Sequence, residues 1–160
     1  VAIIAALFFA SCENGLPLQH AADCKFKTTE SLAQSLALCL RDADFTCAQN
    51  YLPGISNVLT MKSTNEGDGD LDNFGEKADH ILVKALKDEI TKLRDEITAK
   101  GGDVSKLKLL SVTESVDQAV VKLTMHLQAG SVKFTIKPVG LFNSEGSWYL
   151  LGSRFTTTFE

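Results

Sequence analysis

The chain has 160 residues, a formal net charge of −4 at pH 7 and no cluster of lysine and arginine. This composition argues against a nucleic-acid partner, because contacts with phosphates need a basic surface. When residues 1–26 are set aside for the reasons given next, about 135 residues remain, which is enough for one domain with a hydrophobic core.

The chain opens with the apolar stretch VAIIAALFFA, followed by Ser11-Cys12. This stretch is shorter than the roughly 20 residues of a membrane-spanning helix and has the length of the apolar centre of a secretory signal. Phe9-Ala10-Ser11-Cys12 resembles the lipobox of bacterial lipoproteins, in which the signal is cleaved before a cysteine that carries acyl chains. The resemblance implies a signal peptide over 1–11, truncated at its start, and lipid attachment at Cys12. An ordinary signal peptide with an incidental cysteine, or a buried apolar strand, is the alternative.

The lipoprotein resemblance also implies a location and a partner. The location is the bacterial cell envelope, on its periplasmic or surface face, and the partner is the membrane, reached through the lipid anchor. Acyl chains contribute about 0.8 kcal/mol per buried methylene, so two or more give a stable anchor. Residues 12–26 have glycine, proline and polar residues without periodicity. They are expected to be a lipidated tether before a single domain over 27–160.

Cys24, Cys39 and Cys47 follow Cys12. An exported chain permits disulfides, but three cysteines leave one unpaired and their spacing does not give the pairing. Cys39 and Cys47 could meet only if the chain bends between them, and Cys24 could fold back onto either; buried free thiols are the alternative. None of the spacings matches a zinc site.

Two helices are expected first. Residues 29–40 place Leu32 and Leu36 at helical spacing behind a threonine N-cap. Residues 44–52 indicate a second helix, capped by Asp44.

Residues 54–75 are glycine-rich and acidic, which predicts a loose loop. Residues 78–100 then carry the clearest apolar stripe of the chain, with charges of alternating sign on another face. The stripe covers only about three heptads, so packing on the protein's own sheet is favoured over a coiled coil.

From Lys106 onward the hydrophobic period changes from 3.6 to 2, which predicts strands. Short turns separate them, so the strands are expected to pair as an antiparallel meander. The last of four strands is residues 147–159. The expected inward-facing side chains include Val121, Leu123, Met125, Leu127, Val132, Phe134 and Ile136. The predicted fold class is α+β, with N-terminal helices packed on a curved antiparallel four-stranded β-meander.

The order of these elements resembles that of small bacterial lipoproteins of unknown function in the nuclear-transport-factor-2-like, or cystatin-like, superfamily. The resemblance covers about residues 27–155. It includes an aromatic residue at Asp44-Phe45 and a closing strand that begins Gly146-Ser147-Trp148. It implies a cone-like sheet filled by helices, and it implies no single activity, because this fold carries enzymes, binders and oligomerisation modules.

The acidic loop has carboxylates at alternate positions, Asp68, Asp70 and Asp72, as an EF-hand loop does. It lacks the glycine at position six, where Asn73 stands, and the bidentate glutamate at position twelve, where Asp79 stands. We therefore expect no metal site.

Two of the histidines, His80 and His126, could act as a general base if a carboxylate lay beside them. His126 shares its strand face with lysine, threonine and glutamine, which is typical of a wet surface. The third histidine, His20, lies in the expected tether. No phosphate loop, dinucleotide fingerprint or nucleophile elbow is present, so no cofactor is expected.

Two functions remain in contention. The first is a non-enzymatic envelope lipoprotein that binds an envelope protein or a small apolar ligand, the latter in a cone lined by Met125, Phe134 and Tyr149. The second is a hydrolase or isomerase of the same fold that uses His126 or His80 with a carboxylate. A homodimer or larger scaffold formed through an exposed apolar sheet face is a further alternative.

Overall fold

A computed structural model of the protein describes residues 15–52 and 69–160, with side chains from residue 79 onward in the second range. The expected signal peptide, Cys12 and Asp68 lie outside the described residues. The described chain is α+β, as expected: two α-helices, three short 3-10 helices and a six-stranded antiparallel sheet. Within it, neither helix combines the length and the apolarity needed to cross a bilayer.

Helix α2 (Thr29–Asp42) confirms the first predicted helix. Thr28 caps it, since its hydroxyl accepts a hydrogen bond from the backbone N–H of Ser31 and the Ser31 hydroxyl bonds back. Such capping satisfies N–H groups that a helix leaves unpaired. Ala43, in a left-handed conformation with φ of 53°, ends the helix.

The second predicted helix, over 44–52, is wrong. A turn and the short 3-10 helix η2 (Ala48–Asn50) occupy this segment. Asp44 Oδ1 accepts a hydrogen bond from the N–H of Thr46, two residues ahead, at 3.0 Å. This bond forms a local turn at Asp44, and the chain continues as a single 3-10 turn where an α-helix was predicted.

Helix α4 (Gly69–Ala99) begins well before Ala78, so the loop prediction is wrong from residue 69 onward. Adding residues to an existing helix costs far less than nucleating one, and the strong amphipathic segment that follows supplies the nucleus. Asp70 and Asp72 therefore lie on a helical backbone and not in a calcium-type loop. Leu86, Ile90, Leu93 and Ile97 face the core, while Ile81 is 67% exposed.

The sheet contains β1 (Leu107–Asp117), β2 (Val120–Ala129), β3 (Val132–Pro138), β4 (Leu141–Ser144), β5 (Ser147–Leu150) and β6 (Phe155–Phe159). β1 pairs along the length of β2. β3 and β4 both pair with β2, through Met125↔Ile136 and Val121↔Leu141. β5 then pairs with β4 and β6 with β3, which gives the path β5-β4-β2-β3-β6. The sixth strand, β1, lies off this path and pairs with β2.

The expectation of four continuous strands is therefore wrong, because the chain breaks between β3 and β4 and again between β5 and β6. Pro138 has no N–H to donate to a ladder. Next to it, a Cβ on Gly140 would lie 2.7 Å from Val120 Cγ1 and 2.8 Å from Leu151 Cδ1. This close approach lies where the chain bends between β3 and β4.

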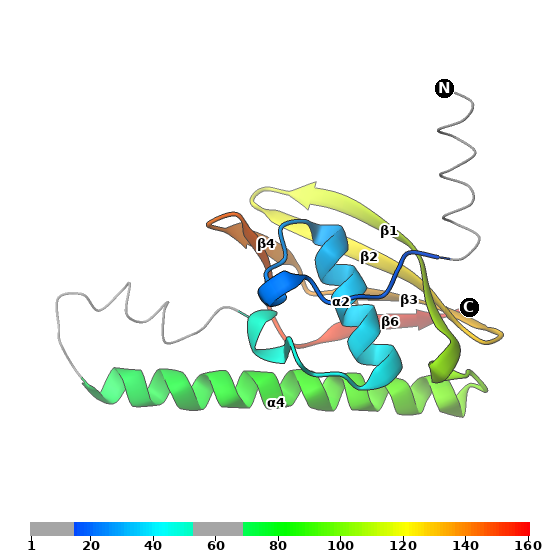
Figure 1. The fold of residues 1–160 in the computed structure, drawn as a ribbon, viewed down its shortest axis with the longest axis horizontal. Coiled ribbons are helices and arrows are strands. Elements are labelled where there is room, and N and C mark those ends of the chain that lie inside the picture. Colours follow the sequence, from blue (N-terminus) through cyan, green and yellow to red (C-terminus); the bar gives the residue numbers. More distant parts are fainter. Residues whose placement is uncertain (1–14, 53–68) are drawn as a thin grey trace, which may run out of the picture.

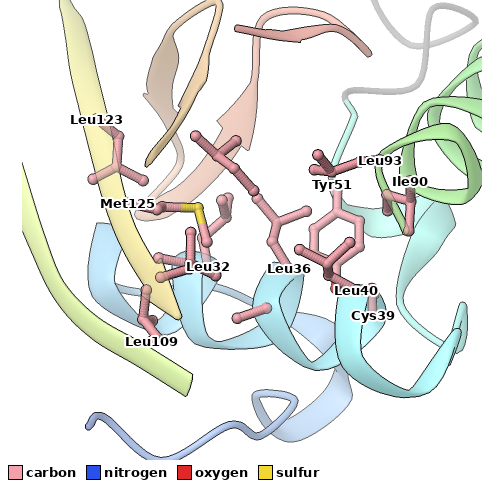
Figure 2. Packing of buried hydrophobic residues seen from close by; sticks show 14 of the residues in the cluster. Leu32, Leu36, Cys39, Leu40, Tyr51, Ile90, Leu93, Leu109, Leu123 and Met125 are labelled. Atoms are coloured by element: carbon pink, nitrogen blue, oxygen red, sulfur yellow. Dashed lines mark hydrogen bonds between the residues drawn. The ribbon is translucent and has the colours of Figure 1, made fainter. Parts of the chain in front are cut away.

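The core lies between one face of the sheet and the two helices. In Figure 1, α2 crosses in front of the sheet and α4 runs along its lower side. Figure 2 shows Leu32, Leu36 and Leu40 of α2 meeting side chains from α4 and from the sheet. Six of the seven predicted inward positions of β2 and β3 are buried: Val121, Leu123, Met125, Leu127, Phe134 and Ile136. The seventh, Val132, is partly buried against the same core.

Candidate functional site

The segment after residue 14 packs against the body over residues 15–26, where a loose tether was expected. The N–H of Leu16 donates to the carbonyl of Leu109 on β1 at 2.7 Å, so this segment adds a bridge to the sheet. Phe26 is 1% exposed and stacks on Tyr51, with ring centroids 5.2 Å apart. The apolar side chains of residues 15–26 are therefore removed from water, whereas those of a solvated tether would stay exposed.

A disulfide joins this segment to the loop after α2. Cys24 and Cys47 are bonded, with Cα atoms 5.3 Å apart, and Cys39 is a buried free thiol. Of the pairings that the sequence left open, the structure contains the one in which the Cys24 segment folds back onto Cys47.

The most chemically suggestive cluster is a chain of polar side chains, which we call the relay: Asp44, His20, Ser35, Tyr51 and Cys39. Nδ1 of His20 lies 2.6 Å from Ser35 Oγ. Ser35 Oγ lies 2.5 Å from the Tyr51 hydroxyl, which lies 3.0 Å from Cys39 Sγ.

The other ring nitrogen of His20 faces a carboxylate. Its Nε2 lies 3.1 Å from Asp44 Oδ2 without forming a hydrogen bond. The relay thus connects the N-terminal segment, α2 and the loop after α2.

Burial controls the protonation of the inner end of the relay. It raises the pKa of the Cys39 thiol to about 11 and raises the pKa of Tyr51 above its ordinary value. At the outer end, hydrogen bonds from the side chain and backbone of Thr46 lower the pKa of Asp44, and His20 lowers it further. At neutral pH the relay therefore has a carboxylate at the surface, and a neutral phenol and a neutral thiol inside.

The residue types Ser, His and Asp match a hydrolytic triad, in which histidine takes a proton from the serine hydroxyl. The accessibility of Ser35 does not match that of a catalytic serine. Ser35 lies within α2 with 0% exposure, and its hydroxyl is held between His20 and Tyr51. A substrate cannot reach Ser35 Oγ in this conformation. The relay is therefore structural: it connects the N-terminal segment to α2 and to the loop after α2.

The two histidines predicted as candidate bases lie elsewhere. His126 is half-buried on β2, and its Nε2 lies 3.5 Å from Thr113 Oγ1. His80 is exposed on α4. Of the histidines that the structure describes, His20 lies beside a carboxylate, with Nε2 3.1 Å from Asp44 Oδ2. Sequence reasoning missed His20 because it assigned the segment to a tether; the flanking Leu16 and Leu18 were the available signal for packing.

Of the three residues predicted to line a ligand cone, two lie on neighbouring strands in the core and the third lines a surface hollow. Met125 and Phe134 are buried in the core at 1% exposure. The void beside Met125 measures about 10 Å³, roughly the least that one water molecule requires. Tyr149 is half-buried on β5, pairs with Phe142 on β4, and lines a surface hollow that includes Trp148. Trp148 beside it is partly buried and packs against the core.

In the part of the chain that the structure describes, no three side chains of histidine, cysteine, aspartate or glutamate gather as metal ligands would. The fold and the relay together define a small α+β protein. A disulfide and a hydrogen bond fix its segment of residues 15–26 to the rest of the domain. No family model, curated protein or solved structure matches the chain.

Proposed function

We propose that this protein is a lipid-anchored lipoprotein of the bacterial cell envelope that acts by binding and not by catalysis. The anchor is Cys12, at the end of the lipobox-like Phe9-Ala10-Ser11-Cys12. This lipobox-like sequence carries the proposal. The structure adds that the described segment after it is fixed to the body at Leu16, His20 and Cys24. An anchor at Cys12 would therefore hold the body close to the membrane.

The disulfide supports the envelope location. Disulfides persist in secreted and periplasmic proteins and are rare in the reducing cytosol. Cys24 and Cys47 are bonded in the folded body, and Cys47 is fully buried. A cytosolic protein would place a metal ligand or a redox-active thiol here more often than a buried structural bridge.

The packing of the interior supports binding by an outer surface. The Ser–His–Asp set is closed to substrate, and the side chains around Met125 leave almost no free volume. We infer that an envelope protein or the membrane itself contacts the exterior, in preference to an apolar ligand within the core. A cone of the nuclear-transport-factor-2-like kind remains our interpretation of the fold; two helices covering one face of a bent antiparallel sheet support it (Figure 1).

The test is expression of the protein with its signal in a bacterium, followed by membrane fractionation and labelling with a radioactive fatty acid. We expect the protein to be labelled and to sediment with membranes, and Cys12→Ser to abolish both. Cys39→Ser is the matched control, because it replaces a buried free thiol outside the lipobox. Membrane association and normal cleavage that persist in Cys12→Ser would contradict the lipid anchor.

A further inference from the structure

A surface hollow of about 500 Å³ opens where the N-terminal segment meets the start of β1. Leu16 and Leu18 supply part of an apolar wall, and Arg41, Lys106 and Lys108 supply basic groups. The volume is within the range of small-molecule sites, about 300–1,000 Å³. A lining that is both apolar and basic matches a ligand that has an anionic part and an apolar part.

The charge of this hollow differs from that of the whole protein. The chain carries −4, whereas every ionisable side chain that lines the hollow is basic. Arg41 is held by Asp42 at 2.9 Å, and Lys106 Nζ lies 3.9 Å from Asp103. No ion pair engages the exposed Lys108 among the residues that the structure describes. Lys108 is therefore the cation most available to a ligand.

The position of the hollow indicates the source of the anion. Leu16 lines it, and Gly15 is three residues after Cys12, which at full extension is about 10 Å of chain. An anchor at Cys12 would therefore bring the hollow to the membrane surface. Anionic lipid headgroups attract lysine and arginine there, over a distance of about one Debye length.

We propose that this hollow binds the phosphodiester headgroup of an anionic phospholipid, and thereby sets which face of the protein rests on the membrane. The proposal rests on the lipid anchor proposed above. Lys108 supplies the main positive charge for the phosphate, and Lys106 and Arg41, which also pair with Asp103 and Asp42, supply further N–H donors. Leu16 and Leu18 contact the glycerol and the first methylenes of the acyl chains. Inorganic phosphate carries the charge without the apolar part, so it binds more weakly.

The test is an NMR titration of the processed chain, residues 12–160 with Cys12→Ser, using monomeric dihexanoyl phosphatidylglycerol. We expect amide shifts concentrated at Leu16, Lys108 and Gln128. Lys106→Glu/Lys108→Glu should weaken binding at least tenfold, since each basic group beside an anionic lipid contributes about fivefold. Lys122→Glu/Lys137→Glu is the matched control, because it makes the same charge change on exposed positions of the sheet outside the hollow.

Three results would overturn the proposal: no shifts at millimolar lipid, equal weakening by both double variants, or equal binding of dihexanoyl phosphatidylcholine. Inorganic phosphate that binds as tightly as the lipid would overturn it as well, and would make the hollow a simple anion site. The titration uses chain without acyl groups, so its failure leaves the Cys12 anchor untouched. Failure of the fractionation experiment, in turn, would remove the membrane argument without changing the titration.

Discussion

Nδ1 of His20 lies 2.6 Å from Oγ of Ser35, so the N-terminal segment is hydrogen-bonded to a serine that is fully buried inside helix α2. The His20 side chain itself is 17% exposed. The contact therefore occurs where bulk water cannot replace the lost partner. This is the condition under which removal of one hydrogen-bonding group is costly.

We expect His20→Ala to lower the free energy of unfolding by about 1–3 kcal/mol, because it leaves the buried Ser35 hydroxyl with one partner fewer. Urea denaturation measures this change. His126→Ala is the control: His126 is half-buried with a long 3.5 Å contact to Thr113, and its loss should cost about 0.5 kcal/mol or less. Equal losses of unfolding free energy in the two variants would show that the relay does not stabilise the packing of the N-terminal segment.

The Cys24–Cys47 bond spans a sequence separation of 23 residues. The loop-closure model gives about 3.5 kcal/mol for a loop of that length. We expect Cys24→Ser/Cys47→Ser to lose about 2–4 kcal/mol in urea melts, and Cys39→Ser to retain the bond. Under denaturing, non-reducing conditions in a Cys12→Ser background, one thiol should react with Ellman's reagent. Two further reactive thiols would mean that the bond is absent.

Stability should fall at alkaline pH because of Cys39. Burial raises the folded-state pKa of Cys39 from 9.0 to about 11, so the unfolded chain loses this proton first. The contribution is complete below pH 9 and is lost as pH rises towards 11, with a size on the order of 2 kcal/mol. We expect the unfolding free energy of Cys39→Ala to decline less between pH 8 and pH 10.5 than that of the unmodified protein. Parallel declines would place the titrating group elsewhere.

The bend between β3 and β4 should be sensitive to a single methyl group. Gly140→Ala would place a Cβ within 2.8 Å of both Val120 and Leu151, and we expect a loss of about 1–3 kcal/mol from overpacking. At Gly152 the nearest side-chain atom would be 3.8 Å away, so Gly152→Ala is the matched control and should change stability by about 0.5 kcal/mol or less. Thermal melts of both variants compare them directly. A Gly140→Ala protein as stable as the control would show that the neighbouring side chains move aside freely.

Local pattern predicted a large part of this fold. The threonine N-cap and leucine spacing predicted α2, and the alternation from Val121 to Leu127 predicted which face of β2 is buried. These signals are readable because helix and strand periods determine which side chains share a face, and the apolar face must pack. Periodicity carries no information on where a strand breaks, so the splits between β3 and β4 and between β5 and β6 were missed. Pro138 was the local signal available for the first split.

The sequence by itself determined the α+β class, the long apolar helix face, the inward set of β2 and β3, and a lipobox-like start whose role stays a prediction. Only the tertiary structure decided that Cys24 pairs with Cys47, that His20 meets Ser35, and that Leu16 lines a basic hollow beside Lys108. The physical reason is that each of these contacts joins segments far apart along the chain. Their proximity results from the packing of the whole core, to which no short window of sequence has access.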